Sequence, residues 1–525
     1  MTSHGDPGAH SGAPRRLTKR AFSGLFWTFS GTGVQGGVHL LVLMALGRLI
    51  TPADFGLMGA AAVVIAFSQI VSQVGVGPAI IQRRDLEPAH IKVAFTLSTG
   101  LGLLLGLGVW FGARDIAAFY RIPALEPVLR GVALMFPMEG LNTVSKSLLA
   151  RELRFRQFVA LDVGSYLVGY ACLGVLLAWL GYGVWALVGA NLAQAVLRTA
   201  AMYRAARHPL RLSFDLRATR DVLGFGVGHS LAQFGHFLSQ QGDNFVVGRW
   251  LGPTALGIYG RAYTFMVMPA TAFGKIVNRV LFPVMAHIQD ERGRLAAAYE
   301  RALAVVALVS LPIASFLLVV APEFVPILLG PGWTEVVVPF QLFTFSLLFR
   351  MSSKISDTLT KAAGVVYARA IRQGVFAVLV VVGAIIGQRW GVGGVAVAVS
   401  IAMGINFMSM ANLSRIVTGL SWSRFARAHA PGALLAALIG GVAAAVVQPA
   451  RAAHLGNVPT LIAAALAAAA ITLLALWLGP NLFLGPHGAW ASKRAVEYLR
   501  QGSFRFTKRR AANADSLVVG EADPK

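Results

Sequence analysis

Five polar side chains recur at helical spacing within the apolar stretch 222–247. They occupy positions i, i+4, i+7, i+11 and i+14, which lie on one face of a helix. The five are His229, Gln233, His236, Gln240 and Asp243. An imidazole changes its charge near neutral pH, so histidines on such a face are candidate proton carriers.

A matching stripe occurs 201 residues earlier, in the apolar stretch 24–46. Its members are Thr28, Thr32, Gln35 and His39. Polar groups deep in a membrane face one another or a water-filled cavity, because lipid offers them no partner. Hydrogen bonds between packed helices would produce the same stripes, so each single residue also admits a structural role. Two stripes in matched positions favour a central polar cavity.

Basic side chains set the charge of this predicted cavity. One helical face near the stretch 335–360 carries Arg350, Lys354, Asp357 and Lys361. Arg261 and Lys146 lie in two further apolar stretches. These four cations, Arg350, Lys354, Arg261 and Lys146, outnumber the carboxylates Glu139, Asp243 and Asp357. We therefore expect an anionic amphiphile as ligand, with phosphate as its anion. Arg198, near the end of the stretch 184–204, either adds to these polar side chains or snorkels to the membrane surface.

These residues sit in a chain of about fourteen apolar stretches, each long enough to span a bilayer. Helices satisfy their own backbone hydrogen bonds in lipid, so we predict an all-α integral membrane protein. The predicted spans are 24–46, 55–80, 92–112, 127–149, 158–180, 184–204, 222–247, 256–281, 299–320, 335–360, 371–388, 392–414, 431–449 and 459–479.

The composition agrees with a membrane location. Of 525 residues, 56% are hydrophobic and 13% are charged, and the net charge is +24. With the N-terminus in the cytoplasm, Lys and Arg gather in the loops assigned to that side, as the positive-inside rule requires. We therefore expect both termini in the cytoplasm and no nucleic-acid partner. The single cysteine, Cys172, excludes an intramolecular disulfide and a cysteine-based metal site.

An internal repeat relates two halves of the chain. The segment 47–59 returns as 248–260, with glycine, arginine and proline matching at an offset of 201 residues. Six predicted spans separate the copies, which indicates two six-helix lobes about a pseudo-two-fold axis along the membrane normal. The predicted parts are a disordered cytoplasmic N-terminus (1–20), an N-lobe (21–204), a basic cytoplasmic linker (205–221), a C-lobe (222–418), two extra C-terminal helices (431–479) and a basic cytoplasmic tail (480–525).

Motifs for catalysis or nucleotide hydrolysis are absent from the sequence. It contains no Walker A, H-E-x-x-H or G-x-S-x-G pattern. A G-x-G-x-x-G match at 31–36 follows no predicted strand and lies inside a predicted membrane helix, so it carries no nucleotide site. We therefore expect a protein that is not an enzyme, has no cofactor or metal, and draws energy from an ion gradient.

Several segments resemble the polysaccharide (oligosaccharide) flippase family of the multidrug/oligosaccharidyl-lipid/polysaccharide exporter superfamily. The similarity is greatest to Wzx-type exporters of lipid-linked repeat units, including the colanic-acid branch. It is carried by the segments 46–56, 148–156, 243–259, 281–285 and 330–333, and it covers roughly residues 20–420.

This resemblance implies a flippase that moves an undecaprenyl-diphosphate-linked oligosaccharide across the bacterial inner membrane by alternating access. The substrate-binding candidates, by helix position, are Arg350, Lys354, Arg261, Lys146, Gln35, His39, Gln233 and Gln240. The candidates for coupling to H⁺ or Na⁺ are His229, His236, Asp243 and Asp357. Expected partners are the lipid-linked oligosaccharide, membrane lipids, and a polysaccharide polymerase with its export machinery.

Three alternatives remain open at this point. A lipid II flippase of the same superfamily is hard to separate by sequence. A cation-coupled drug exporter should have an acidic cavity, which the Arg and Lys excess argues against. A membrane polymerase or ligase would usually need a large outer loop for its catalytic groups, and the loops assigned outside are short.

Overall fold

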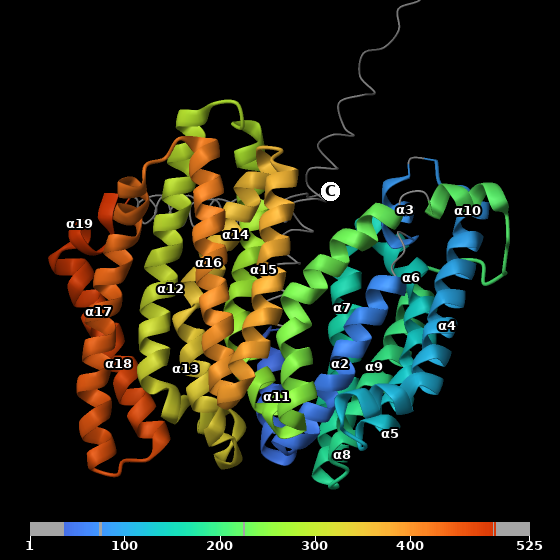
Figure 1. Cartoon of the computed structure of the whole chain (residues 1–525), viewed down its shortest axis with the longest axis horizontal. Helices are drawn as coiled ribbons and strands as arrows, with labels where there is room; N and C mark the ends of the chain where they lie inside the picture. Colours follow the sequence, from blue (N-terminus) through green and yellow to red (C-terminus); the bar gives the residue numbers. More distant parts are fainter. Residues whose placement is uncertain (1–35, 73–75, 84, 224–225, 487, 490–525) are drawn as a thin grey trace, which may run out of the picture. The chain divides into compact units, whose positions relative to one another are not determined.

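A computed structural model describes residues 36–72, 76–83, 85–223, 226–486 and 488–489. Within these ranges all regular structure is helical and no strand occurs, which confirms the all-α class (Figure 1). The first predicted part (1–20) and Gln35 lie outside the described residues, as does most of the predicted tail (480–525).

The helices follow one another with short connections. In chain order they are the segment Gly36–Leu49, α2 (Pro52–Ser72), α3 (Val76–Gln82), α4 (Pro88–Tyr120), α5 (Leu125–Ala133), α6 (Met135–Arg151), α7 (Phe155–Tyr166), the π-helix η1 (Leu167–Gly174), α8 (Val175–Trp179), α9 (Val184–Ala205), α10 (Leu216–Leu223), α11 (Gly226–His287), α12 (Arg292–Leu329), the 3-10 helix η2 (Pro331–Val336), α13 (Val337–Phe345), α14 (Leu347–Ala362), α15 (Val366–Gly387), the 3-10 helix η3 (Gln388–Trp390), α16 (Gly391–Thr418), α17 (Trp422–Ala452), α18 (Asn457–Leu478) and α19 (Pro480–Phe483).

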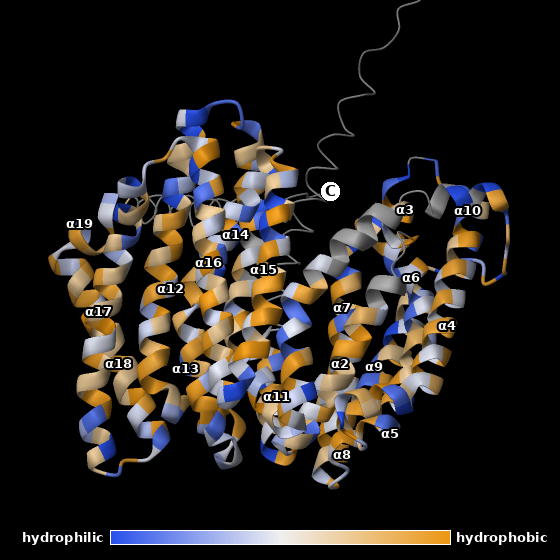
Figure 2. Cartoon of the chain, viewed as in Figure 1, coloured by the Kyte–Doolittle hydropathy of each residue, from blue (hydrophilic) through white to orange (hydrophobic). Residues whose placement is uncertain are grey.

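Six helical stretches among the described residues are long and apolar enough to cross a bilayer, and the bent pair Pro331–Phe345 and Leu347–Ala362 makes a seventh. One of the six, Val366–Thr418, contains both α15 and α16. Hydrophobic residues extend along α12, and hydrophilic residues gather at its turn with α11 (Figure 2). The chain is therefore a multi-pass membrane protein, while the count of fourteen spans stays a prediction.

The described chain packs as two compact units. Unit 1 contains residues up to Ala272, with Ala321–Phe343 and Ala370–Asn406. Unit 2 contains Phe273–Val320, Thr344–Arg369 and the residues from Phe407 onward. The boundaries fall inside α11, α12, α13, α15 and α16. The lobes and linker proposed from the repeat stay a prediction.

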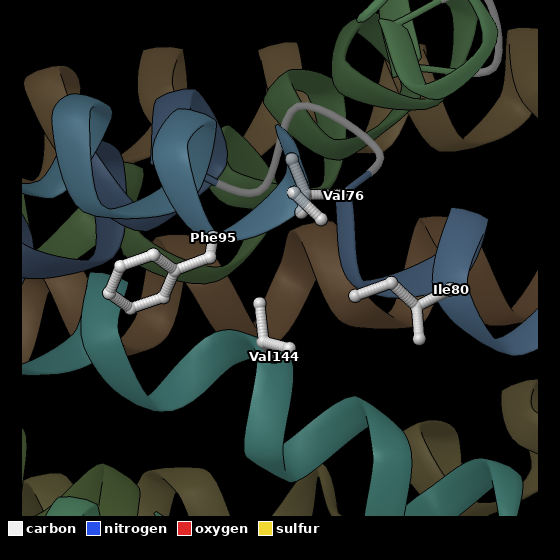
Figure 3. Close-up of a cluster of buried hydrophobic side chains, with 5 residues drawn as sticks. Val76, Ile80, Phe95 and Val144 are labelled. Atoms are coloured by element: carbon white, nitrogen blue, oxygen red, sulfur yellow. The ribbon is translucent and has the colours of Figure 1, made fainter. Parts of the chain in front are cut away.

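Three helices of unit 1 meet in a small apolar cluster. Val76 and Ile80 of α3 lie against Phe95 of α4 and Val144 of α6, each at most 4% exposed (Figure 3). The guanidinium of Arg151, on α6, donates hydrogen bonds of 2.6 Å to two carbonyls at the end of α3, those of Ile80 and Arg83. These bonds satisfy carbonyls that have no partner within their own helix.

A proline and a glycine explain one interruption inside a predicted span and one break between two predicted spans. The predicted span 127–149 is divided between α5 and α6, because Pro137 has no N–H to donate to the carbonyl of Ala133. In α11 the chain leaves helical geometry at Gly252, whose φ of 86° is open to glycine at little cost. Gly252 lies between the predicted spans 222–247 and 256–281.

In unit 2, α17 packs closely on α12 and also on α18. A Cβ on Gly432 of α17 would lie 2.5 Å from the carbonyl oxygen of Ala307, so only glycine allows this approach. The Ser315 hydroxyl donates a hydrogen bond of 2.7 Å to the carbonyl of Ala436. The helices α17 and α18 run side by side (Figure 1). These contacts join the predicted extra pair of helices to the rest of unit 2.

Candidate functional site

Arg261 is the predicted site residue with the most unusual surroundings in unit 1. It lies on α11, and its guanidinium stacks over the ring of Phe55, on α2, at 4.3 Å from the centroid. The side chain is partly exposed, yet its Nε is buried and has no hydrogen-bond partner among the described residues. A buried donor without a partner is costly unless a ligand or water supplies one. This arrangement suits an anion held at one edge of the guanidinium.

His39, on the segment Gly36–Leu49, lies near Arg261 and is exposed. Its ring stacks on Tyr166 of α7, with centroids 5.1 Å apart. Tyr166 in turn stacks on Tyr170 of η1. The structure thus brings two predicted residues, His39 and Arg261, to one place and adds two tyrosines that sequence reasoning missed. Their spacing of four residues was the available signal, but it is equally typical of ordinary helix packing.

Asp243 and Gln240 contact two tyrosines that lie beyond the break in α11 at Gly252. The Tyr259 hydroxyl donates a hydrogen bond of 2.7 Å to Asp243, whose side chain is only 1% exposed. The Tyr263 hydroxyl approaches the Gln240 oxygen at 3.4 Å. Asp243 and Gln240 form the C-terminal end of the predicted polar face. The side chains of His229, Gln233 and His236, at its other end, lie outside the described residues.

In unit 2, α14 carries three predicted residues on one face: Arg350, Lys354 and Asp357. Asp357 forms ion pairs with Lys361, at 2.7 Å, and with Arg369 at the start of α15. Lys354 lies near these charges and near Arg350, but it has no ion-pair partner within 4 Å among the described residues. Its stem passes Gly274, whose Cβ would lie 3.7 Å away.

We define the Lys354 cluster as Arg350, Lys354, Asp357, Lys361 and Arg369. It holds four cations and one carboxylate, so its net charge is strongly positive. A positive cluster of partly buried groups attracts a multiply charged anion such as a phosphate ester. Arg261 belongs to unit 1 and this cluster to unit 2. A single cavity shared by both therefore stays a prediction.

Lys146 lies on α6 and is exposed, with no ion pair within 4 Å among the described residues. Its neighbour by helical spacing, Glu139, pairs instead with Arg198 of α9. Asp162 of α7 lies 3.7 Å from the same guanidinium. Arg198 therefore joins three helices within unit 1, and the sequence analysis named neither partner. Within the described ranges, no three His, Cys, Asp or Glu residues gather to hold a metal ion.

A family model described as "Polysaccharide biosynthesis protein" matches residues 45–338, which is more than half of the chain. The lipopolysaccharide biosynthesis protein WzxC of Escherichia coli strain K12 is 27% identical over 66% of this chain and 71% of that protein. The teichuronic acid biosynthesis protein TuaB of Bacillus subtilis strain 168 is 25% identical over 66% and 72%. The succinoglycan biosynthesis transport protein ExoT of Rhizobium meliloti strain 1021 is 26% identical over 57% and 60%. These matches confirm the predicted family.

Two solved structures share the fold. The lipid II flippase MurJ, in an inward closed conformation, superposes with a TM-score of 0.68 over 88% of this chain and 99% of its own, at 13% identity. An inward-facing multidrug transporter of the MATE family gives a TM-score of 0.59 over 74% and 96%, at 17% identity. At these identities the two structures show that the fold is shared. The family match and the relatives named above place the chain among transport proteins of polysaccharide biosynthesis and not among enzymes.

Proposed function

Because the chain belongs to the polysaccharide biosynthesis protein family, we propose that it is a flippase for an undecaprenyl-diphosphate-linked oligosaccharide. It moves the lipid from the cytoplasmic to the periplasmic leaflet of the bacterial inner membrane. The relatives WzxC, TuaB and ExoT, named for polysaccharide biosynthesis or transport, support this substrate class. A polysaccharide polymerase and its export machinery would then receive the product.

One observation carries the proposal: partly buried cations in each unit lack an acidic partner. Arg261 has an unsatisfied Nε, and Lys354 has no carboxylate within 4 Å among the described residues. A diphosphate crossing the membrane must lose its hydration, which is costly unless cations replace it. Arg261, Arg350 and Lys354 would bind this group, while Gln35, Gln233, Gln240 and His39 would contact sugars. Lys146, in the predicted N-lobe, would also bind the diphosphate.

Transport would proceed by alternating access of two six-helix lobes, within fourteen spans and with both termini cytoplasmic. The fold shared with MurJ and a MATE transporter supports this mechanism. A gradient of H⁺ or Na⁺ would supply the energy through His229, His236, Asp243 or Asp357. Asp357 is the least favoured of these, because it is already paired with two cations.

The charge of the candidate site and the names of the relatives distinguish the proposed function from the two other transporter functions. A cation-coupled drug exporter needs acidic groups for its cargo, whereas the Lys354 cluster is cationic. The likeness to MurJ favours lipid II as a second candidate, since it too is an undecaprenyl diphosphate carrying sugars. The polysaccharide relatives favour a repeat unit over lipid II.

Deletion of the gene tests the proposal. In the deletion strain, lipid-linked oligosaccharide should accumulate on the cytoplasmic face, and export of the polymer should stop. The wild-type protein should restore export, whereas the double variant Arg350→Ala, Lys354→Ala should not. Arg114→Ala and Arg389→Ala, which change two exposed arginines, serve as controls and should restore export. Normal export by the double variant would refute the assignment of the cationic site.

A further inference from the structure

Three aromatic rings form a continuous stack beside Arg261. His39 and Tyr166 have centroids 5.1 Å apart and planes inclined by 29°. Tyr166 and Tyr170 are 4.9 Å apart and inclined by 20°. Tyr166 is only 8% exposed, whereas His39 is exposed. The stack therefore presents one open ring that two further rings support from behind.

The supporting rings are held by an unusual turn. Tyr170 lies in η1, a π-helix that interrupts the line from α7 to α8. There the backbone approaches α9 so closely that a Cβ on Gly169 would lie 2.8 Å from the carbonyl oxygen of Ala190. The Asn191 amide of α9 donates a hydrogen bond of 3.0 Å to the Tyr170 hydroxyl. π-turns inside helices often mark functional sites, and a rigid platform loses little entropy when a ligand binds.

Arg261 is close enough to all three rings to interact with them electrostatically. Its flat face already lies on Phe55, at 4.3 Å, so its N–H edges are the part that remains for a ligand. Guanidinium edges bind phosphate oxygens in pairs. A diphosphate at Arg261 would bring the group bonded to it next to the exposed ring of His39.

Sugar rings suit such a surface. One face of a hexose carries several C–H groups, and the negative face of an aromatic ring attracts their positive edges. A purely structural stack gives no reason for an exposed, ionisable ring beside a cation, since an apolar ring would pack as well. We propose that His39, Tyr166 and Tyr170 form a binding platform for the sugar bonded directly to the diphosphate. This inference rests on the proposed function.

The test compares two probes on the full-length protein in lipid nanodiscs. One probe is undecaprenyl diphosphate, and the other is the same lipid carrying a single galactose. Wild type should bind the galactosyl lipid about threefold to tenfold more tightly, the range expected for one aromatic stacking contact. His39→Leu should remove this difference without weakening the bare diphosphate, and His39→Phe should retain it. Arg261→Gln should weaken both probes.

A matched control breaks a stack elsewhere in unit 1. Phe324 and Phe340 lie 5.7 Å apart and are inclined by 18°. Phe324→Leu should leave the ratio of the two affinities unchanged. Equal binding of both probes by wild type, or a preference retained by His39→Leu, would overturn the platform alone. Failure of wild type to bind either probe would overturn the proposed function, and the platform with it.

Discussion

Gly56 and Gly257 pack against each other in a reciprocal contact. A Cβ on Gly56 would lie 1.7 Å from the carbonyl oxygen of Pro253, and a Cβ on Gly257 would lie 1.8 Å from that of Pro52. Both Pro-Gly pairs are related by the same offset of 201 residues that defines the sequence repeat. A contact that each copy makes with the other in the same way is the geometry of a local two-fold axis.

Replacing either glycine should destabilise this contact. Gly56→Ala or Gly257→Ala forces two backbones apart, because the obstructing atoms are carbonyl oxygens and cannot rotate away. We expect a loss of about 1–3 kcal/mol of unfolding free energy, the usual range for overpacking. Thermal unfolding in detergent measures it. Gly260→Ala is the control, since its Cβ would meet nothing within 4 Å. Equal stability of the Gly257 and Gly260 variants would contradict the observed packing.

Trp333 holds the end of the segment Gly36–Leu49. Its indole N–H donates a hydrogen bond of 2.7 Å to the carbonyl of Gly47, and the residue is 2% exposed. Trp333→Phe keeps an aromatic ring but leaves that carbonyl without its donor, so stability should fall by about 1–3 kcal/mol. Trp179→Phe, at a residue that is 72% exposed, should change the same unfolding midpoint very little. If Trp333→Phe unfolds at the same midpoint as wild type, this hydrogen bond contributes nothing to stability.

Asp357 should act mainly as a structural carboxylate. Its side chain is 14% exposed and forms ion pairs with both Lys361 and Arg369. Asp357→Asn leaves both cations without this partner and should cost about 1–2 kcal/mol, a value reduced for their partial exposure. Lys361→Gln should cost less, because Arg369 still pairs with Asp357. Full stability of Asp357→Asn, together with loss of gradient-dependent transport, would instead identify Asp357 as the ion carrier.

His208 makes stability depend on pH. It lies between α9 and α10, where its ring is tilted against Phe95 and edge-on to Tyr203. Burial lowers its pKa below 6.5 despite a hydrogen bond to the Pro209 carbonyl. Its buried Nε2 has no partner in the described chain, so protonation there is unfavourable. The folded protein therefore binds this proton less readily than the unfolded chain. Stability from His208 is complete above about pH 6.5 and declines as pH falls through the lower folded-state pKa.

The measurement is the unfolding midpoint at several pH values between pH 7 and pH 5. His208→Phe should make this midpoint fall less steeply as the pH is lowered. His287→Phe, at an exposed residue that ends α11, is the control and should keep the wild-type slope. An unchanged slope in His208→Phe would show that other groups cause the pH dependence.

Local sequence signals predicted several helices closely. The predicted span 184–204 corresponds to α9 (Val184–Ala205), and 371–388 corresponds to α15 (Val366–Gly387). The length of a hydrophobic stretch is a local property of the sequence, so it can be determined without knowing which helices pack against it. The repeat could also be read directly, because Pro52 and Gly56 match Pro253 and Gly257 letter for letter.

The sequence could not predict which side chains contact one another, because such contacts depend on which helices are adjacent. Glu139 and Asp162 both approach Arg198, although the three residues lie on different helices. Tyr166 and Tyr170 form a stack in a chain segment that passes from α-helix to π-helix, a change that periodicity does not reveal. The charge of the candidate site was therefore accessible from sequence, but its aromatic half was not.

The most direct test of the central claim is transport by the purified protein in liposomes. A fluorescent undecaprenyl-diphosphate galactose would be incorporated, and its movement between leaflets followed by chemical quenching of the outer leaflet under an imposed H⁺ or Na⁺ gradient. We predict gradient-dependent movement by wild type and by Arg389→Ala, and its loss in the double variant Arg350→Ala, Lys354→Ala. Equal movement by the double variant and wild type, or none by wild type under either gradient, would contradict the account.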